Sequence, residues 1–321
     1  MANRTIWALT DGKIGMVNQA VGLASAIARE AGNFDIIEKE VVPSRLWSLL
    51  PAGFWPPGIS GVAAPGLELP WPDLVVGCGR HAVGPAIWIK RQSGGSTRIV
   101  HAQHPRTGAA WFDAIVSQSH DGLSGANVIV VLGSMNRLTG DLLLDAMQSM
   151  PVEITALPKP VVAVLLGGAN GTYRMTTEIA GKLADELQTL VKRSGCGLMV
   201  TTSRRTGADN EALLRSRLKG PGFYFWDGVG ANPYFTFLGR ADAILVTCDS
   251  VNMVSEACYT GKPVYVLALD GGTGSKFARF HEEMERLQYT RPFLGYIELT
   301  DAKALDETTR AAREIVERLA L

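Results

Sequence analysis

Short runs of β-branched and apolar residues alternate along this chain with longer segments of helical period, and this alternation constrains the fold more than any other feature. In the first half we expect strands at 5–9, 34–41, 73–76, 97–100, 114–116 and 127–131. After the first strand, apolar residues from Val17 to Ala28 recur at i, i+3 and i+4, which predicts a helix with one buried face. Strands alternating with helices are typical of a parallel sheet with crossover helices.

The same order of elements begins again after residue 160, with strands expected at 160–166, 197–202, 222–226, 243–246 and 263–267. Between the halves, MPVEITALPKP at 150–160 has three prolines and no helical period, which is typical of a linker. The 321 residues are about twice a usual domain length. We therefore predict an α/β protein with two doubly wound domains, 1–152 and 158–321, facing each other across a cleft. An alternative for the final helix is that it packs back on the first domain.

Composition excludes several classes of protein. Lys plus Arg and Asp plus Glu number 31 each, and a net charge of zero argues against a nucleic-acid partner. The four cysteines are far apart, which suits reduced thiols better than disulfides or zinc. The N-terminal sequence resembles no signal or transit peptide, and no apolar run approaches 18 residues. We expect a cytoplasmic protein.

A glycine-rich turn, GGANG, follows the strand expected at 160–166 and precedes a helix. There the backbone N–H groups near Gly168 and Asn170 and the helix dipole favour an anion. A purely structural glycine turn is the alternative. The turn lacks the lysine of a P-loop and the spacing of GxGxxG.

Two further strand ends in the second half carry polar residues. Arg204 and Arg205 follow the strand at 197–202, where guanidinium groups can bind a pyrophosphate. The alternative is a solvated loop with surface arginines. After 243–246, Asp249 or Ser250 can cap a helix, and Glu256 lies two turns along it. A glutamate there suits the two hydroxyls of a ribose better than a phosphate.

The first half offers candidates for acid–base chemistry. Asp11 follows the first strand, where a carboxylate can act as the base for an acceptor hydroxyl or can cap a helix. His101, His104 and His120 follow neighbouring strands, but the HxxH pair of His101 and His104 lies on a loop without cysteine or carboxylate ligands nearby, so a metal site is poorly supported. His104 is the alternative base or an acceptor contact, with Arg106 nearby.

Nine short segments occur in one order between residues 5 and 285: TDGKIGMVNQ, GCGRH, HAQHPR, FDAIVSQSHD, GGANGTYRMT, SRRTG, WDGVGANPY, DSVNMVSEA and GGTGSKFARFH. Together they resemble the elongated-mitochondria (mitochondrial fission ELM) family, whose many bacterial members are regarded as candidate GT-B glycosyltransferases. The segment around DSVNMVSEA is similar to the donor-nucleotide element of GT-B enzymes. Asn252 stands where the family more often has Ser, and Gly207 where Pro often follows SRRT.

The resemblance implies a GT-B fold, a nucleotide-diphosphate sugar as co-substrate, and no cofactor or metal. It implies diphosphate contacts at Gly168, Asn170, Ser203, Arg204, Arg205, Ser250, Asn252 and Met253. Glu256 becomes the ribose ligand. Trp226 either stacks on the base or is a core tryptophan, with Asn232 in the loop that follows, and Lys276 either approaches the sugar or is a surface charge. Gly12, Arg106 and His120 become acceptor contacts.

The function expected is transfer of a sugar from that donor to a glycan, lipid-linked or lipopolysaccharide acceptor. Alternatives are a sugar-nucleotide epimerase of the same fold and a non-catalytic scaffold at a membrane. The aromatic segment at 43–57 has three possible roles. They are packing in the core, a cap over the acceptor, and a docking patch for the inner face of the membrane. The oligomeric state is left open.

Overall fold

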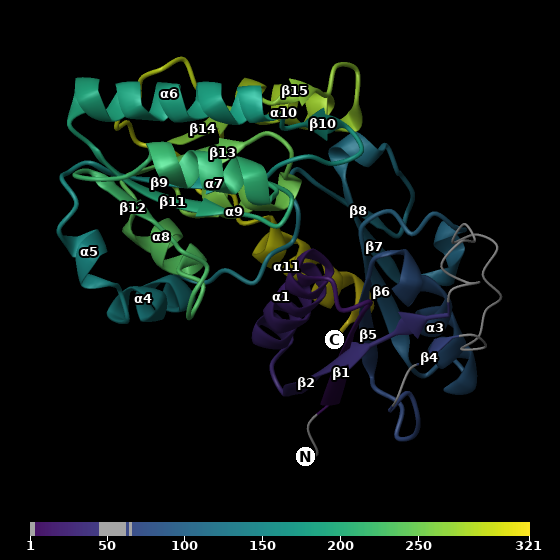
Figure 1. Cartoon of the computed structure of the whole chain (residues 1–321). Helices are drawn as coiled ribbons and strands as arrows, with labels where there is room; N and C mark the ends of the chain where they lie inside the picture. Colours follow the sequence, from purple (N-terminus) through teal and green to yellow (C-terminus); the bar gives the residue numbers. More distant parts are fainter. Residues whose placement is uncertain (1–3, 45–61, 64–65) are drawn as a thin grey trace. The chain divides into compact units, whose positions relative to one another are not determined.

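The computed structural model describes residues 4–44, 62–63 and 66–321 (Figure 1). They form two compact units: unit 1 contains Met1–Arg137 and Asp306–Leu321, and unit 2 contains Leu138–Leu305. Each unit is built on a six-stranded sheet in which every neighbouring pair of strands is parallel. The predicted α/β class with parallel sheets is confirmed.

The sheet of unit 1 has the strand order β2-β1-β5-β6-β7-β8. The chain adds β2 on one side of β1 and all later strands on the other, so the direction of winding switches between β1 and β5. A two-stranded antiparallel pair, β3 and β4, stands apart from this sheet. The bounds are β1 Arg4–Thr10, β2 Phe34–Glu40, β3 Val42–Pro43, β4 Val62–Ala63, β5 Leu74–Cys78, β6 Arg98–Ala102, β7 Ala114–Gln118 and β8 Val128–Val131.

Helices cover both faces of this sheet. On one face, α1 (Ile14–Ala31) and α11 (Glu307–Leu319) pack against one side of each strand, as at Ile6. On the other face, α3 (Arg80–Gln92) packs against the alternate positions, as at Trp7. This two-residue period explains why the strands are buried on both sides. Two short 3₁₀ helices, η2 (Ala109–Trp111) and η3 (Ser119–Asp121), flank β7.

The sheet of unit 2 has the order β12-β11-β9-β13-β14-β16, and its winding switches between β9 and β13. A small antiparallel pair, β10 with β15, lies outside it. The bounds are β9 Val161–Leu166, β10 Tyr173–Arg174, β11 Gly197–Thr202, β12 Phe223–Phe225, β13 Ala243–Thr247, β14 Val264–Leu267, β15 Asp270–Gly271 and β16 Arg291–Pro292.

The helices of unit 2 also lie on both faces of its sheet (Figure 1). One apolar stripe of α6 is buried, with Leu183, Leu187 and Leu190 packed on the strands together with Leu214 of α7. The helices α8 and α9 contact the strands β9, β13 and β14 from the other side. The bounds are α4 Gly140–Gln148, α5 Val152–Thr155, α6 Thr177–Ser194, α7 Ala208–Arg217, α8 Tyr234–Arg240, α9 Val251–Tyr259 and α10 Lys276–Arg286.

The boundary between the units lies earlier than the proline-rich pattern at 150–160 predicts, between Arg137 and Leu138. The cause is helix α4, which packs on α8: the Thr236 hydroxyl donates to the Ala146 carbonyl at 2.8 Å. The segment 138–152, predicted to lie in the first domain, therefore belongs to unit 2. The predicted linker itself contains the short helix α5.

The C-terminal helix α11 belongs to unit 1, although the sequence to its N-terminal side forms unit 2. Glu307 accepts a hydrogen bond from the Leu132 amide at 2.7 Å, and Thr308 accepts one from the Asn136 amide at 3.0 Å. The buried side chains of α11 pack against α1. The two crossings of the chain between units therefore lie at 137/138 and 305/306.

Three further sequence features bear on the surroundings of the protein. All four cysteines are buried and unpaired. Within the described ranges, no helix is both long and apolar enough to pass through a lipid bilayer. Of the aromatic segment at 43–57, residues 45–57 lie outside the described residues.

Candidate functional site

The carboxyl ends of β9, β11 and β13 come together at the switch point of unit 2, where ligands of doubly wound sheets bind. The loops pack so closely that two positions require glycine. A β-carbon on Gly167 would lie 2.1 Å from Oδ1 of Asp249, and one on Gly168 would lie 2.0 Å from the carbonyl oxygen of Arg205. The glycine-rich turn therefore serves first to let the three loops meet.

Asp249 is the residue that joins these loops. Its side chain is fully buried, and Oδ2 lies 2.6 Å from Nη2 of Arg205. Oδ1 accepts a hydrogen bond from the Thr247 hydroxyl at 2.7 Å, and that hydroxyl accepts one from the Gly167 amide at 2.7 Å. The side-chain amide of Asn170 donates to the Asp249 carbonyl at 3.1 Å. Asp249 thus holds the β9, β11 and β13 loops together rather than capping α9.

A second contact joins the β9 and β11 loops. The Thr206 hydroxyl, fully inside the protein, donates to the Gly167 carbonyl at 2.5 Å and accepts from the Ser203 amide at 3.1 Å. The Ala169 amide donates to the Arg205 carbonyl at 3.1 Å. Because these donors and acceptors satisfy one another, the loops form a rigid floor at this edge of the sheet.

Several predicted diphosphate contacts are used to build this floor. The Asn170 side-chain oxygen accepts from the amides of Thr172 and Tyr173, at 2.7 and 2.9 Å. The Ser203 hydroxyl accepts from the Arg205 amide at 3.2 Å, and the Arg205 guanidinium is paired with Asp249. These side chains hold each other in place. Their position after strand ends in the sequence did not show whether they bind a ligand or stabilise the loops.

Arg204 differs from its neighbour. Its side chain is exposed, and within the described part of the chain no hydrogen bond or ion pair engages its guanidinium. Of the two predicted arginines, Arg204 is therefore the cation that a ligand can engage without breaking a contact of the fold.

Helix α9 begins beside the loop that carries Asp249. Ser250 is its N-cap, and the hydroxyl accepts from the Met253 amide at 3.3 Å. No acidic residue lies in the first turn, where Asn252 is half-buried. The remaining amides of that turn and the helix dipole favour a negative group at this end. Of the two predicted capping residues, the structure uses Ser250.

Glu256 is buried on α9 and accepts a hydrogen bond from the Tyr234 hydroxyl at 2.6 Å. Tyr234 begins α8, and its amide donates to the Asn232 side-chain oxygen at 3.0 Å. Burial and the adjacent Glu256 carboxylate raise the pKa of Tyr234 well above its ordinary value of 10. Tyr234 therefore stays a neutral donor. No sequence spacing indicated this pair.

The other predicted donor-site residues lie on neighbouring elements of unit 2. Trp226 follows β12, is half-buried, and donates from Nε1 to the Val229 carbonyl at 3.2 Å. Lys276 is the first residue of α10, with Nζ 5.8 Å from the centre of the Phe277 ring. Nε2 of His281 lies 2.7 Å from the Cys248 carbonyl oxygen, so His281 has a structural contact.

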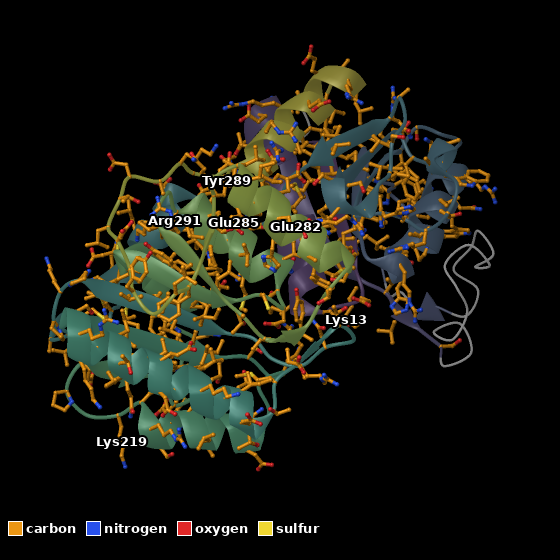
Figure 2. All side chains as sticks on the ribbon, turned by 90° about the horizontal axis from the view of Figure 1, so that it is seen from above. Lys13, Lys219, Glu282, Glu285, Tyr289 and Arg291 are labelled. Atoms are coloured by element: carbon orange, nitrogen blue, oxygen red, sulfur yellow. The ribbon has the colours of Figure 1, made fainter. Side chains whose placement is uncertain are left out.

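The corresponding edge of unit 1 has its own polar cluster at the switch between β1 and β5. Asp11 follows β1 and His81 lies in the first turn of α3; Oδ2 of Asp11 is 2.8 Å from Nδ1 of His81. Both side chains are only 8% exposed. Lys13, labelled in Figure 2, places Nζ 2.5 Å from the same carboxylate oxygen. Gly12 leaves room for Glu40, whose Oε1 would lie 2.5 Å from a β-carbon there.

The charge of Asp11 follows from these neighbours. Burial raises the pKa of its carboxyl, but the hydrogen bonds from Lys13 and His81 and the positive charge of Lys13 outweigh burial and lower the pKa below its ordinary 3.8. Asp11 is therefore ionised at neutral pH. The sequence signal for His81, the GCGRH segment at the end of a strand, was present but was assigned no role.

The predicted acceptor residues beyond β6 and β7 lie at the same edge of the sheet. His104 accepts through Nδ1 from the Arg106 amide at 2.9 Å. Arg106 has φ +58°, and Gln103 has φ +86°, backbone conformations that non-glycine residues rarely adopt and that are often found near functional sites. His120 is buried in η3. The loop after β6 is thus held in a strained conformation.

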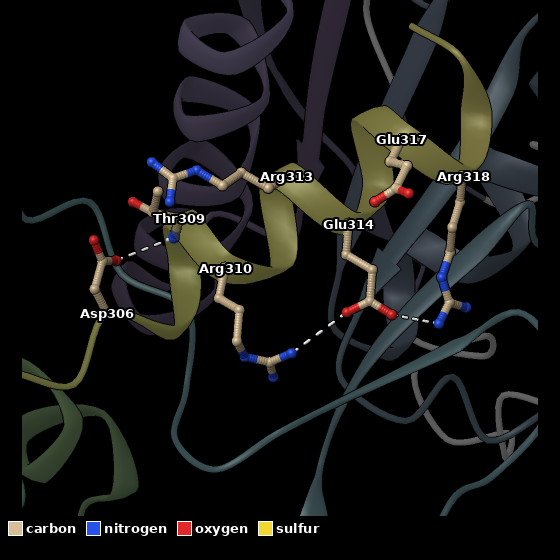
Figure 3. A pocket seen from close by; sticks show the side chains of 7 residues that line it. All are labelled: Asp306, Thr309, Arg310, Arg313, Glu314, Glu317 and Arg318. Atoms are coloured by element: carbon tan, nitrogen blue, oxygen red, sulfur yellow. Dashed lines mark hydrogen bonds and ion pairs between the residues drawn. The ribbon is translucent and has the colours of Figure 1, made fainter.

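Two other kinds of site, a metal site and a pocket on α11, are not supported by the described residues. Among the described residues, no group of three or more His, Cys, Asp and Glu side chains is arranged to hold a metal ion. A hollow of about 850 Å³ lies along the exposed face of α11 (Figure 3). Its three acidic residues balance its three arginines; Glu314, for example, pairs with both Arg310 and Arg318. The hollow has no uncompensated charge.

Two doubly wound parallel-sheet units, each with polar residues at its switch point, define a protein of the GT-B fold, which glycosyltransferases and sugar-nucleotide epimerases share. The chain belongs to the mitochondrial fission ELM1 family, whose model matches residues 14–319. This result confirms the family resemblance of the nine segments.

Sequence relatives and solved structures are consistent with that assignment. Mitochondrial fission protein ELM1 of Arabidopsis thaliana is 29% identical over 290 residues, covering 82% of this chain and 67% of the relative. The uncharacterized protein RP120 of Rickettsia prowazekii is 22% identical, covering 97% of each chain. UDP-GlcNAc 2-epimerase of Methanocaldococcus jannaschii has a similar fold, with a TM-score of 0.59, 12% identity and 99% of each chain covered.

A structure of UGT71G1 from Medicago truncatula complexed with UDP-glucose also has a similar fold. Its TM-score is 0.51 at 13% identity, and the match covers 98% of this chain and 93% of that one. At such low identity these structures establish the shared fold.

Proposed function

We propose that the protein binds a nucleotide-diphosphate sugar at the switch point of unit 2 and transfers the sugar to a glycan, lipid-linked or lipopolysaccharide acceptor at the switch point of unit 1. The fold supports this proposal because it is shared with proteins solved in complex with UDP-glucose or UDP-GlcNAc. The polar edge of unit 2 supports it independently.

The observation that carries the proposal is the unequal use of two adjacent arginines. Arg205 neutralises the buried Asp249, and Arg204 remains exposed beside it. Arg204 and the first-turn amides of α9 would hold the diphosphate and stabilise the charge that develops as it leaves. A transferase needs such a group because the sugar–phosphate bond breaks heterolytically.

The remaining unit 2 residues have separate roles in this proposal. Glu256, held by the Tyr234 hydroxyl, would accept hydrogen bonds from the ribose. Trp226 would border the base, and Lys276 would approach the sugar or its phosphates. In unit 1, Asp11, Gly12, His104, Arg106 and His120 would surround the acceptor hydroxyl.

Calorimetry with UDP, UDP-glucose, UDP-GlcNAc and GDP tests the diphosphate site. Loss of a hydrogen bond to a charged group corresponds to about 1.5–3 kcal/mol, so Arg204→Ala should weaken binding by roughly 10- to 150-fold. Lys219→Ala is the matched control, because Lys219 is an exposed cation beyond the end of α7 in the same unit (Figure 2). Equal affinities for the two variants would contradict the site.

The ribose contact has its own test. Glu256→Gln keeps the shape of the side chain and removes its charge. The variant should bind UDP several-fold more weakly than the wild type, and both should bind 2′,3′-dideoxyuridine diphosphate with equal affinity. Equal losses for both nucleotides would show that Glu256 acts on the fold and not on the ribose.

A sugar-nucleotide epimerase is the second candidate, because two structures of the M. jannaschii UDP-GlcNAc 2-epimerase have TM-scores of 0.59 and 0.53. An epimerase converts UDP-GlcNAc to an isomer without an acceptor, whereas a transferase releases UDP. Product analysis by chromatography and mass spectrometry separates these outcomes. A scaffold would instead be favoured if no nucleotide changed the melting temperature and if Arg204→Ala and Glu256→Gln had no effect on the function of the protein.

A further inference from the structure

The pair formed by Asp11 and His81 is built by the topology of unit 1. The residues are 70 positions apart in sequence, but β1 and β5 are neighbours in the sheet, so the loop after β1 meets the start of α3. Both side chains are almost completely enclosed. A buried imidazole against a buried carboxylate is an arrangement that maintenance of the fold does not require.

The neighbours of His81 fix its tautomer. Nε of Arg80 donates to Nε2 of His81 at 3.0 Å, so Nε2 carries the lone pair. The ring proton therefore lies on Nδ1 and is donated to Asp11 at 2.8 Å. His81 has its basic nitrogen directed toward Arg80, whose side chain is exposed. Displacement of Arg80 from Nε2 would give a ligand hydroxyl access to that lone pair.

The charges around His81 keep the ring neutral. Burial lowers its pKa below 6.5; Asp11 opposes this effect, and the positive charges of Arg80 and Lys13 add to it. A neutral imidazole at pH 7 can accept a proton. The ionised Asp11 is the weaker base of the two, because Lys13 and His81 stabilise its charged form.

We propose that His81 is the catalytic base of sugar transfer and that Asp11 is its positioning residue. This inference rests on the proposed function. The acceptor hydroxyl displaces Arg80 from Nε2, and its oxygen forms a bond to the anomeric carbon. The bond from that carbon to the diphosphate oxygen breaks, and the electron pair leaves with the nucleoside diphosphate. The hydroxyl proton moves to Nε2, and Asp11 stabilises the resulting imidazolium.

The state of His81 can be measured without any substrate. In the full chain labelled with ¹⁵N-histidine, NMR should show the His81 ring neutral at pH 7 with its proton on Nδ1. Arg80→Met should raise the pKa of His81, and Asp11→Asn should lower it. Arg29→Met is the matched control, because Arg29 is an exposed cation in the last turn of α1. A proton on Nε2, or a pKa indifferent to both substitutions, would overturn the proposal.

Reactivity gives a second measurement on the same variants. Diethyl pyrocarbonate acylates an unprotonated imidazole nitrogen, and peptide mass mapping locates the product. Arg80→Met should increase the rate of acylation of His81, because Nε2 loses the donor that occupies it. The same rate in the wild type and in Arg80→Met would show that Arg80 does not control access to Nε2.

The catalytic test uses UDP-GlcNAc and UDP-glucose as probes, with water as acceptor and UDP release as the readout. His81→Asn retains an amide near the position of Nδ1 and lacks the base, so kcat should fall by at least about 100-fold while UDP affinity is unchanged. In Arg80→Met the acidic limb of kcat/KM should move to higher pH. Arg80 affects the pKa of His81 and is not among the groups that shift Asp11, so an unmoved limb would assign the base to Asp11.

The outcomes separate this proposal from the function on which it rests. UDP binding with release that is insensitive to His81→Asn would overturn the base and leave the donor site intact. Failure of every nucleotide to bind or to be cleaved would contradict the proposed function and, with it, the catalytic role of His81. In that case a confirmed tautomer and a pKa that responds to Arg80 would establish only the Asp11–His81 pair itself.

Discussion

Oδ2 of the fully buried Asp249 lies 2.6 Å from Nη2 of Arg205, and this contact gives two adjacent arginines different roles. Arg205 compensates a charge inside the protein, although 43% of its own side chain is exposed. Arg204 has no such partner within the described residues. The two arginines therefore differ in role because the buried Asp249 carboxylate is paired with Arg205 and not with Arg204.

The stabilities of two variants should reflect that difference. Arg205→Ala leaves the Asp249 carboxylate buried without its cation, which we expect to destabilise the protein by about 2 kcal/mol, less than a fully buried pair because Arg205 is partly exposed to solvent. Arg204→Ala should change the free energy of unfolding by less than about 0.5 kcal/mol. Urea denaturation followed by fluorescence compares the two, and equal losses would argue against the buried-charge explanation.

The glycine turn after β9 makes a second prediction. Gly167→Ala should destabilise unit 2 and weaken nucleotide binding, because the new β-carbon would overlap Asp249 and force the β13 loop to move. Gly171→Ala is the matched control in the same turn, since nothing lies within 4 Å of a β-carbon there. Thermal unfolding and UDP calorimetry on both variants measure the effect. Tolerance of Gly167→Ala would show that the loops are not rigid.

The fold and the location of the sites follow from local patterns. Strand ends are visible as changes of hydrophobic period, and ligands of parallel sheets bind at those ends, so the glycine turn, the arginines and Asp11 could be placed before the structure was known. The pairing of residues across the sheet was not predictable. Asp11 meets His81 because β5, which leads into α3, is a neighbour of β1 in the sheet. This strand order is a property of the whole unit, so local sequence patterns did not reveal the contact.

The same limit applies to roles within a motif. Asp249 and Ser250 are chemically equivalent as helix caps in the sequence, and it is the folded structure that shows Asp249 directed into the protein, against Gly167 and Arg205. The domain boundary was misplaced for a related reason. Prolines at 150–160 are a strong local signal, whereas the packing of α4 on α8 is a contact across about 90 residues, as between Ala146 and Thr236.

A third prediction concerns the hydrogen bond between Tyr234 and Glu256. Tyr234→Phe removes the hydroxyl and retains the ring, so Glu256 loses the donor that orients it. Affinity for UDP should fall several-fold, corresponding to about 1 kcal/mol. The affinity for 2′,3′-dideoxyuridine diphosphate, which lacks both ribose hydroxyls, should equal that of the wild type. If Tyr234→Phe and Glu256→Gln act through the same contact, the double variant should lose no more than the larger single effect, which calorimetry can establish.

The fourth prediction is a pH dependence of stability set by His101. This side chain on β6 is 1% exposed, both ring nitrogens lack a hydrogen-bond partner among the described residues, and burial, with a smaller effect of His104, lowers its pKa from 6.5 to about 3. The unfolded chain therefore binds the proton more tightly, and stability present above pH 6.5 is lost as the pH falls toward 3, by up to about 1.4 kcal/mol per pH unit. His101→Leu should be more stable by about 1 kcal/mol at pH 7 and less sensitive to acid. Urea denaturation at pH 7 and pH 5, with His104→Leu as control, checks both effects; equal acid sensitivity of His101→Leu and the wild type would contradict the assignment.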